Sequence, residues 1–138
     1  ADLEYKFILS EYKETESAPL ALLQLGEIGL KRFDHIDYDV KGLKNARRYF
    51  ERFIEEAPIY SALSPEIKAV VDRELPGARE KVNRINEIEA EKEFAVAEYY
   101  RRRDYLESAA LFYRYILKVY PRTSWASRSK ERLAEMGK

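Results

Sequence analysis

The feature that most constrains the fold is a spacing that occurs in three places along the chain. A small residue is followed by an aromatic residue four positions on, an apolar residue three further on, and proline five beyond that. The spacing is complete at Ala109, Tyr113, Ile116 and Pro121 and at Ala46, Phe50, Phe53 and Pro58, and partial at Ala1, Tyr5 and Ile8. Offsets of four and three keep side chains on one helix face, and a small residue lets a neighbouring helix approach closely. The spacing predicts repeated helices, each stopped by proline.

The segments before the two complete copies predict a partner helix for each. An apolar residue, a small residue and then a bulky residue three positions later is typical of the first helix of a tetratricopeptide repeat. Val96-Ala97 with Tyr100 fits this pattern, and Leu25-Gly26 fits it in part, with Gly29 at the bulky position. The unit over 97–121 keeps the register of a repeat of about 34 residues. We therefore expect an all-α fold of antiparallel helix hairpins, TPR-like, stacked in a right-handed superhelix.

The apolar periodicity places helices at about 2–12, 19–31, 43–56, 65–74, 78–103, 105–119 and 124–136. Ser64 is the expected N-cap before Pro65, and Pro76-Gly77 is expected to break the chain. The predicted organisation begins with the second helix of a truncated repeat over 1–14, followed by a repeat over 19–58 with a loop insertion at 33–42. Helix hairpins then extend over 65–121, and they include a long helix over 78–103 and the last repeat. A capping helix over 124–138 ends the chain. Half a helix pair leaves an apolar face uncovered, so we expect a longer array of which this is the C-terminal part.

Composition excludes several classes of protein. The chain has no Cys and one His, which excludes disulfides, thiolate nucleophiles and multi-His metal centres. No phosphate-binding Gly-rich loop, HExxH or GxSxG motif occurs. We expect neither catalysis nor a cofactor or metal. The Asp34–Asp39 run could bind Ca²⁺ through alternating carboxylates, but it lacks the EF-hand glycine, and a solvated loop is the favoured interpretation.

Charge is unevenly distributed along a chain that is neutral as a whole. Residues 101–138 carry ten basic and four acidic side chains, a net charge of +6, so the first hundred residues carry −6. Overall neutrality argues against binding to nucleic acid. A basic end indicates an acidic partner or an anionic surface. The alternative is that Arg101–Arg103 only complete a helix and interact with its C-terminal dipole.

Tyrosine is abundant, with 11 copies, and several crowd the last repeat. Core positions explain part of this number, and the surplus is compatible with a binding surface, because Tyr buries a large area at low entropic cost. The predicted protein-binding residues are Tyr99, Arg101, Arg102, Arg103, Tyr105, Phe112 and Arg122.

One block of residues carries a family resemblance. Phe94-Ala95-Val96-Ala97-Glu98-Tyr99-Tyr100, followed by Arg103, Ala109-Ala110, Tyr120-Pro121 and Thr123, resembles the C-terminal repeats of the BamD family. These are the tetratricopeptide lipoproteins of the outer-membrane β-barrel assembly machinery. The resemblance extends over nearly the whole chain, but only the 94–123 block is fairly specific.

Two positions depart from the family pattern. Asp104 stands where the family usually has Gly, and Leu111-Phe112 stands where it often has Asn-Arg. That Arg belongs to the partner-contacting region, so the substitution indicates a divergent partner surface or a different client.

The resemblance implies a scaffold on the periplasmic face of the outer membrane, tethered by an N-terminal lipid whose Cys would lie upstream of this chain. Such proteins dock the POTRA domains of a BamA-like partner through their C-terminal repeats. The contact would fall around Tyr99–Tyr105 and the following helix. The alternative is another TPR adaptor of the envelope or cytoplasm, such as a cell-division coordinator or a pilus-type lipoprotein, that binds peptide segments in its groove. An enzyme or metal-dependent protein using the 33–42 loop is the third class considered.

Overall fold

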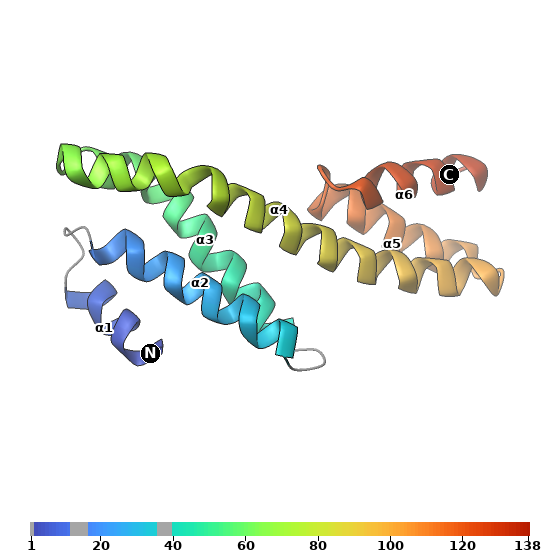
Figure 1. Cartoon of the computed structure of the whole chain (residues 1–138). Helices are drawn as coiled ribbons and strands as arrows, with labels where there is room; N and C mark the ends of the chain where they lie inside the picture. The colour runs from blue at the N-terminus through green and yellow to red at the C-terminus, as the bar shows by residue number, and fades with distance from the viewer. Residues whose placement is uncertain (1, 12–16, 36–39) are drawn as a thin grey trace. The chain divides into compact units, whose positions relative to one another are not determined.

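The computed structural model describes residues 2–11, 17–35 and 40–138. These residues form α1 (Asp2–Glu11), α2 (Ser17–His35), α3 (Val40–Ser61), α4 (Pro65–Arg102), α5 (Leu106–Val119) and α6 (Ser124–Glu135) (Figure 1). No strand occurs in these ranges, so the prediction of an all-α fold is confirmed. The chain forms two compact units, residues 1–82 and 83–138, and α4 contributes to both.

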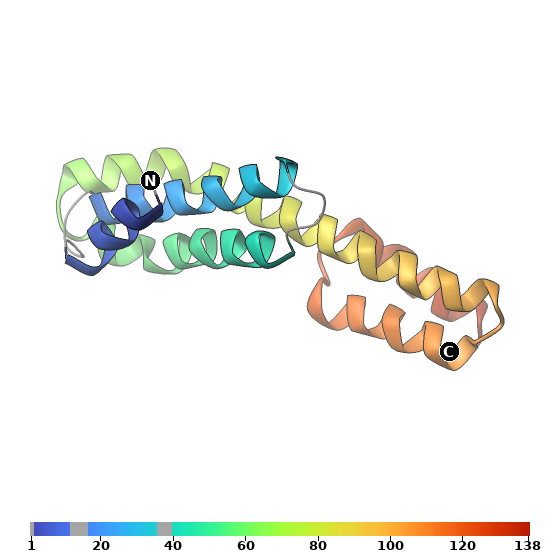
Figure 2. The ribbon, with the colours of Figure 1, turned by 90° about the horizontal axis from the view of Figure 1, so that it is seen from below.

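The N-terminal unit is built around the α2–α3 hairpin. The two helices lie antiparallel and side by side in both views (Figures 1 and 2). Its fully buried side chains come from α2, α3 and the first part of α4, and include Leu22, Leu25, Leu43, Phe50, Phe53 and Val71. Two of these, with the equally buried Ala46, are the residues that the repeated spacing placed on a core face.

Close approach of α2 and α3 depends on two glycines. A Cβ atom on Gly29 would lie 2.8 Å from Cβ of Ala46 and 2.9 Å from the carbonyl oxygen of Gly42. A Cβ atom on Gly26 would lie 2.6 to 2.8 Å from atoms of the Phe50 ring. Position 29 is glycine instead of the expected bulky residue because the α3 backbone occupies the space that a side chain would need.

The loop predicted at 33–42 is too long. Helix α2 continues to His35 and α3 already begins at Val40, so the two helices take up all of the predicted loop except residues 36–39. At the start of α3, the Gly42 backbone already packs against Gly29 of α2. Residues 36–39 lie outside the described ranges, and so does the greater part of the Asp34–Asp39 run.

Pro121 follows the end of α5, as the repeated spacing predicts, but two other prolines that were expected to end helices lie inside them. The prediction that Pro58 stops its helix is wrong, since α3 continues to Ser61, and the predicted break at Pro76-Gly77 is wrong, since α4 runs for 38 residues. A proline inside a helix costs about 3 kcal/mol and leaves the carbonyl four residues earlier without its donor. Both prolines are exposed, so water can satisfy those carbonyls. Tyr60 after the first proline and Ala78 after the second are buried, so each helix continues to pack beyond its proline.

The C-terminal unit consists of the second part of α4 with α5 and α6, each antiparallel to the helix before it (Figure 1). Ala97, Ala109, Tyr113 and Ile116 are completely buried, as the repeated spacing predicts. The Phe94 ring packs at 5.6 Å from the Tyr113 ring and ties α4 to α5.

Helix ends in this unit are closed by defined caps. At the end of α4 the Tyr105 amide donates to the Tyr100 carbonyl and the Asp104 amide to the Arg101 carbonyl, which is a Schellman motif. Asp104 takes the left-handed position of that motif with φ 65°, where Gly is favoured and where the BamD family usually has Gly. Thr123 caps α6 by accepting a hydrogen bond from the Ala126 amide at 3.2 Å.

The N-cap predicted for the start of α4 is confirmed. The Ser64 hydroxyl accepts a hydrogen bond from the Ile67 amide at 3.1 Å.

Candidate protein-binding surfaces of the C-terminal unit

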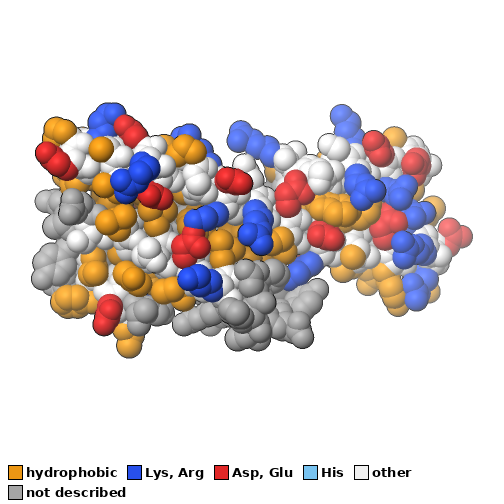
Figure 3. Space-filling view, in the orientation of Figure 1, with side chains coloured by type: hydrophobic (Ala, Val, Ile, Leu, Met, Phe, Trp, Pro, Cys, Tyr) orange, Lys and Arg blue, Asp and Glu red, His pale blue; other side chains and the backbone are white. Residues whose placement is uncertain are grey.

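The structure distributes the predicted binding residues over different parts of the C-terminal unit. One lies in an ion-pair network, one lines a groove between α4 and α6, four lie at or near the α4–α5 turn, and one follows the far end of α5. In the space-filling view, Lys and Arg side chains gather over this unit with hydrophobic side chains exposed among them (Figure 3).

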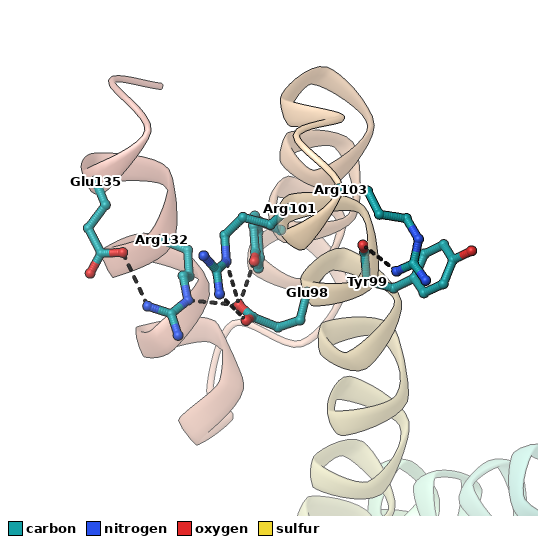
Figure 4. Close-up of polar contacts among 7 residues, drawn as sticks. Glu98, Tyr99, Arg101, Arg103, Arg132 and Glu135 are labelled. Carbon is teal, nitrogen blue, oxygen red and sulfur yellow. Dashed lines mark hydrogen bonds and ion pairs between the residues drawn. The ribbon is translucent and has the colours of Figure 1, made fainter.

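Arg101 belongs to a network centred on Glu98, which is only 6% exposed. The Nη2 atom of Arg101 lies 2.6 Å from one carboxylate oxygen of Glu98. The other oxygen accepts hydrogen bonds from the Tyr113 hydroxyl at 2.6 Å and from Arg132 Nε at 2.7 Å. Figure 4 shows Arg101 and Arg132 converging on Glu98 from α4 and α6. The Glu98 carboxylate thus joins all three helices of the unit, and the guanidinium of Arg101 is bound to this carboxylate inside the chain.

The network shifts the pKa of both of its buried members. Burial alone would raise the pKa of Glu98, but hydrogen bonds from Arg101, Tyr113 and Arg132 outweigh burial and lower it from 4.5 to about 2. Burial and the adjacent Glu98 carboxylate raise the pKa of Tyr113 from 10.0 to about 12. Both shifts favour the ionised carboxylate beside the neutral phenol.

We expect Glu98 to make the C-terminal unit sensitive to acid. A lowered pKa in the folded state means that the stabilisation is complete above pH 4.5 and is lost as the pH falls toward 2. The loss should reach at most about 3 kcal/mol. Denaturant unfolding followed by Trp125 fluorescence measures it, and Glu98→Gln should flatten this part of the pH profile. Glu135→Gln, at an exposed member of the same network, should leave the profile unchanged, and parallel profiles for wild type and Glu98→Gln would refute the assignment.

The α4–α5 turn carries four of the predicted residues, Tyr99, Arg103, Tyr105 and Phe112, and we call these four together with Tyr100 the turn surface. Tyr99 and Tyr105 are 50% and 60% exposed. The Arg103 guanidinium lies 3.6 Å from the centre of the Tyr99 ring and donates to the Tyr99 carbonyl oxygen at 3.3 Å. Figure 4 shows this pair on the other side of α4 from Glu98. The cation is therefore held in place on an aromatic ring instead of being free in solvent.

Ring contacts made by Tyr100 hold the side chains of the turn surface in place. The half-buried Tyr100 ring stacks on Phe112 with centroids 5.7 Å apart and packs edge-on against Tyr99 at 5.5 Å and Tyr105 at 6.4 Å. The exposed rings are thereby anchored on a fixed base, and the surface is organised before any partner binds.

Helix α5 adds an exposed apolar row to this unit. Leu111, Tyr115 and Val119 are four residues apart, and their side chains are between 43% and 66% exposed. This spacing puts them on one helix face. The exposed Arg114 and Lys118 lie beside the row, so α5 presents apolar and basic side chains together.

Arg122 does not join the turn surface. It follows α5, whose 14 residues span about 21 Å, whereas the turn surface lies around the start of α5 and reaches no further along it than Phe112 (Figure 1). Arg102 also lies apart, in the wall of the groove between α4 and α6.

Sequence reasoning missed the central carboxylate and its distant partner. Glu98 and Arg101 could have been paired from their spacing of three residues. Arg132 is 34 residues from Glu98, and no local signal connects them.

Neither a metal-binding cluster nor a membrane-spanning helix occurs within the described residues. No group of three or more His, Asp or Glu side chains is placed to hold a metal ion there. No helix in the same ranges has the length and apolar character needed to cross a membrane.

Comparison of the chain with protein-family models, curated proteins and solved structures found no significant match.

Proposed function

We propose that this chain is a non-catalytic, TPR-like scaffold whose helix hairpins form a right-handed superhelix and which docks another protein through the turn surface. The partner class we propose is the POTRA domains of a BamA-like barrel-forming protein, at the periplasmic face of the outer membrane. The resemblance of the 94–123 block to the BamD family supports this choice of partner. The observation that carries the docking role is the pair of exposed tyrosines beside a ring-stacked arginine.

The physical argument for docking rests on preorganisation. Tyr and Arg are enriched among the residues that dominate binding energies. A partner that meets side chains already held by stacking pays less conformational entropy on association. The Schellman motif fixes the turn backbone, and Tyr100 with Phe112 supports the rings. The apolar row on α5 extends the area that a partner could cover beyond the turn.

The test is a binding titration with the purified POTRA domains of the barrel-assembly protein from the same organism. The double variant Tyr99→Ala with Tyr105→Ala should weaken binding by about 30-fold, since hot-spot truncations cost about 2 kcal/mol or more. Calorimetry gives the affinity, and circular dichroism checks that the variant is folded. Both side chains are half exposed or more, so the fold should be retained.

Two charge reversals locate the contact. Arg103→Glu removes the stacked cation from the turn surface and should weaken binding about tenfold. Arg122→Glu makes the same change beyond the far end of α5 and should leave affinity within about twofold. Equal effects of the two reversals, or unchanged binding by the double tyrosine variant, would contradict docking through the turn surface.

A further inference from the structure

A groove separate from the turn surface lies between α4 and α6 in the C-terminal unit. It encloses about 380 Å³, at the lower end of the range for ligand-binding pockets. The space suits one or two side chains of a partner. Helix α4 contributes Phe94, Ala95 and Arg102 to its walls, and α6 contributes Trp125, Arg128 and Arg132.

The floor of the groove is aromatic. The Phe94 and Trp125 rings lie 5.0 Å apart at an angle of 45°. Phe94 is buried and Trp125 is half-buried, so part of the indole remains accessible. Ala95 is small and exposed beside them, which leaves room above the rings. An apolar side chain entering here would be removed from water against two rings.

The walls of the groove carry two cations besides Arg132, one beside the rings and one at the end where α4 finishes. Arg128 lies 5.0 Å from the centre of the Trp125 ring and 5.9 Å from that of Phe94. Within the described part of the chain, neither Arg128 nor the exposed Arg102 forms an ion pair with a carboxylate. Two guanidinium groups therefore face the groove without an acidic partner, and an incoming carboxylate would complement them.

The two acidic residues of the groove do not cancel this charge. Glu98 is already neutralised by Arg101 and Arg132. Glu91 lies 11 residues before Arg102 on α4, about 16 Å away along the helix, and among the described residues it forms no ion pair with Arg128. The groove thus has an apolar middle with Arg128 beside it and a positive end at Arg102.

We infer that this groove binds an extended acidic segment of another protein. A large apolar or aromatic side chain of that segment occupies the space over Phe94 and Trp125, and neighbouring carboxylates pair with Arg102 and Arg128. A single-stranded nucleic acid would use the same ring and cations, but the chain as a whole is neutral, which argues against it. The site is independent of docking through the turn surface.

The chain's single tryptophan reports binding directly, because it lines the groove. The probe is a synthetic peptide, Gly-Ser-Glu-Phe-Asp-Glu-Ser-Gly, titrated at low salt while Trp125 emission is recorded. We expect saturable binding that weakens by about tenfold when Gln and Asn replace the acidic residues, and by a similar factor when Gly replaces Phe. Affinity should fall as salt is raised.

Variants test the two cations. Arg102→Glu and Arg128→Gln should each weaken peptide binding by about tenfold, whereas Arg114→Glu, an equal charge reversal on α5, should not change it. Arg102→Lys should retain most of the affinity, which distinguishes loss of charge from loss of fold. An unchanged Trp125 signal up to millimolar peptide, equal affinity for the acidic and amide peptides, or tighter binding of an eight-nucleotide oligothymidine would each overturn the inference. Neither Arg102→Glu nor Arg128→Gln alters the turn surface or the apolar row on α5, so POTRA binding should persist in both.

Discussion

Replacing Glu98 with Ala is expected to destabilise the C-terminal unit by about 2–4 kcal/mol. The buried Tyr113 hydroxyl, now bonded to Glu98 at 2.6 Å, would be left with no acceptor. Arg101 and Arg132 would face each other without the carboxylate that lies between them. Denaturant unfolding followed by Trp125 fluorescence measures the effect within the unit that contains the network.

Two companion variants separate burial from charge. Glu135→Ala removes an exposed carboxylate that pairs with the same Arg132 and should cost at most about 0.5 kcal/mol. Adding Tyr113→Phe to Glu98→Ala removes the orphaned hydroxyl and should recover part of the lost stability. Equal losses for Glu98→Ala and Glu135→Ala would show that the network does not hold the unit together.

Adding one methyl group at Gly29 should destabilise the N-terminal unit by about 1–2 kcal/mol. Alanine favours a helix by about 1 kcal/mol over glycine, but overpacking typically costs about 1–3 kcal/mol. Here the new Cβ would meet Ala46 and the Gly42 backbone below 3.0 Å, and backbone cannot move aside as a flexible side chain can. Thermal unfolding monitored by circular dichroism should show the loss.

Gly77 supplies the matched control for this substitution. It lies inside α4 with nothing within 4 Å of an added Cβ, so Gly77→Ala should stabilise by about 1 kcal/mol through helix propensity alone. A Gly29→Ala protein that gains stability as Gly77→Ala does would show that α2 and α3 are not in close contact at Gly29.

The helices and their core faces could be predicted from the sequence because the signal is local. Offsets of four and three identified Ala46, Phe50 and Phe53 in one unit, and Tyr113 with Ile116 in the other, and all five are completely buried. The N-cap at Ser64 could be predicted for the same reason, because a capping side chain and the amide that donates to it are only three residues apart.

The binding residues could be predicted only as a cluster of side-chain types. Three consecutive arginines point in different directions because successive helix positions are rotated by about 100°. Sequence alone does not decide which of them faces a buried carboxylate, which faces a groove and which lies on a ring. The structure assigns these places to Arg101, Arg102 and Arg103 respectively.

By itself, the sequence determined that this chain is helical and which side chains each hairpin buries, because both follow from periodicity over a few residues. Tertiary structure decided where helices continue through Pro58 and Pro76, why Gly29 replaces a bulky residue, and how Arg132 reaches Glu98. Each of these outcomes depends on contacts between residues that are distant in the sequence. Such contacts exist only once the helices have packed, so local sequence patterns do not predict them.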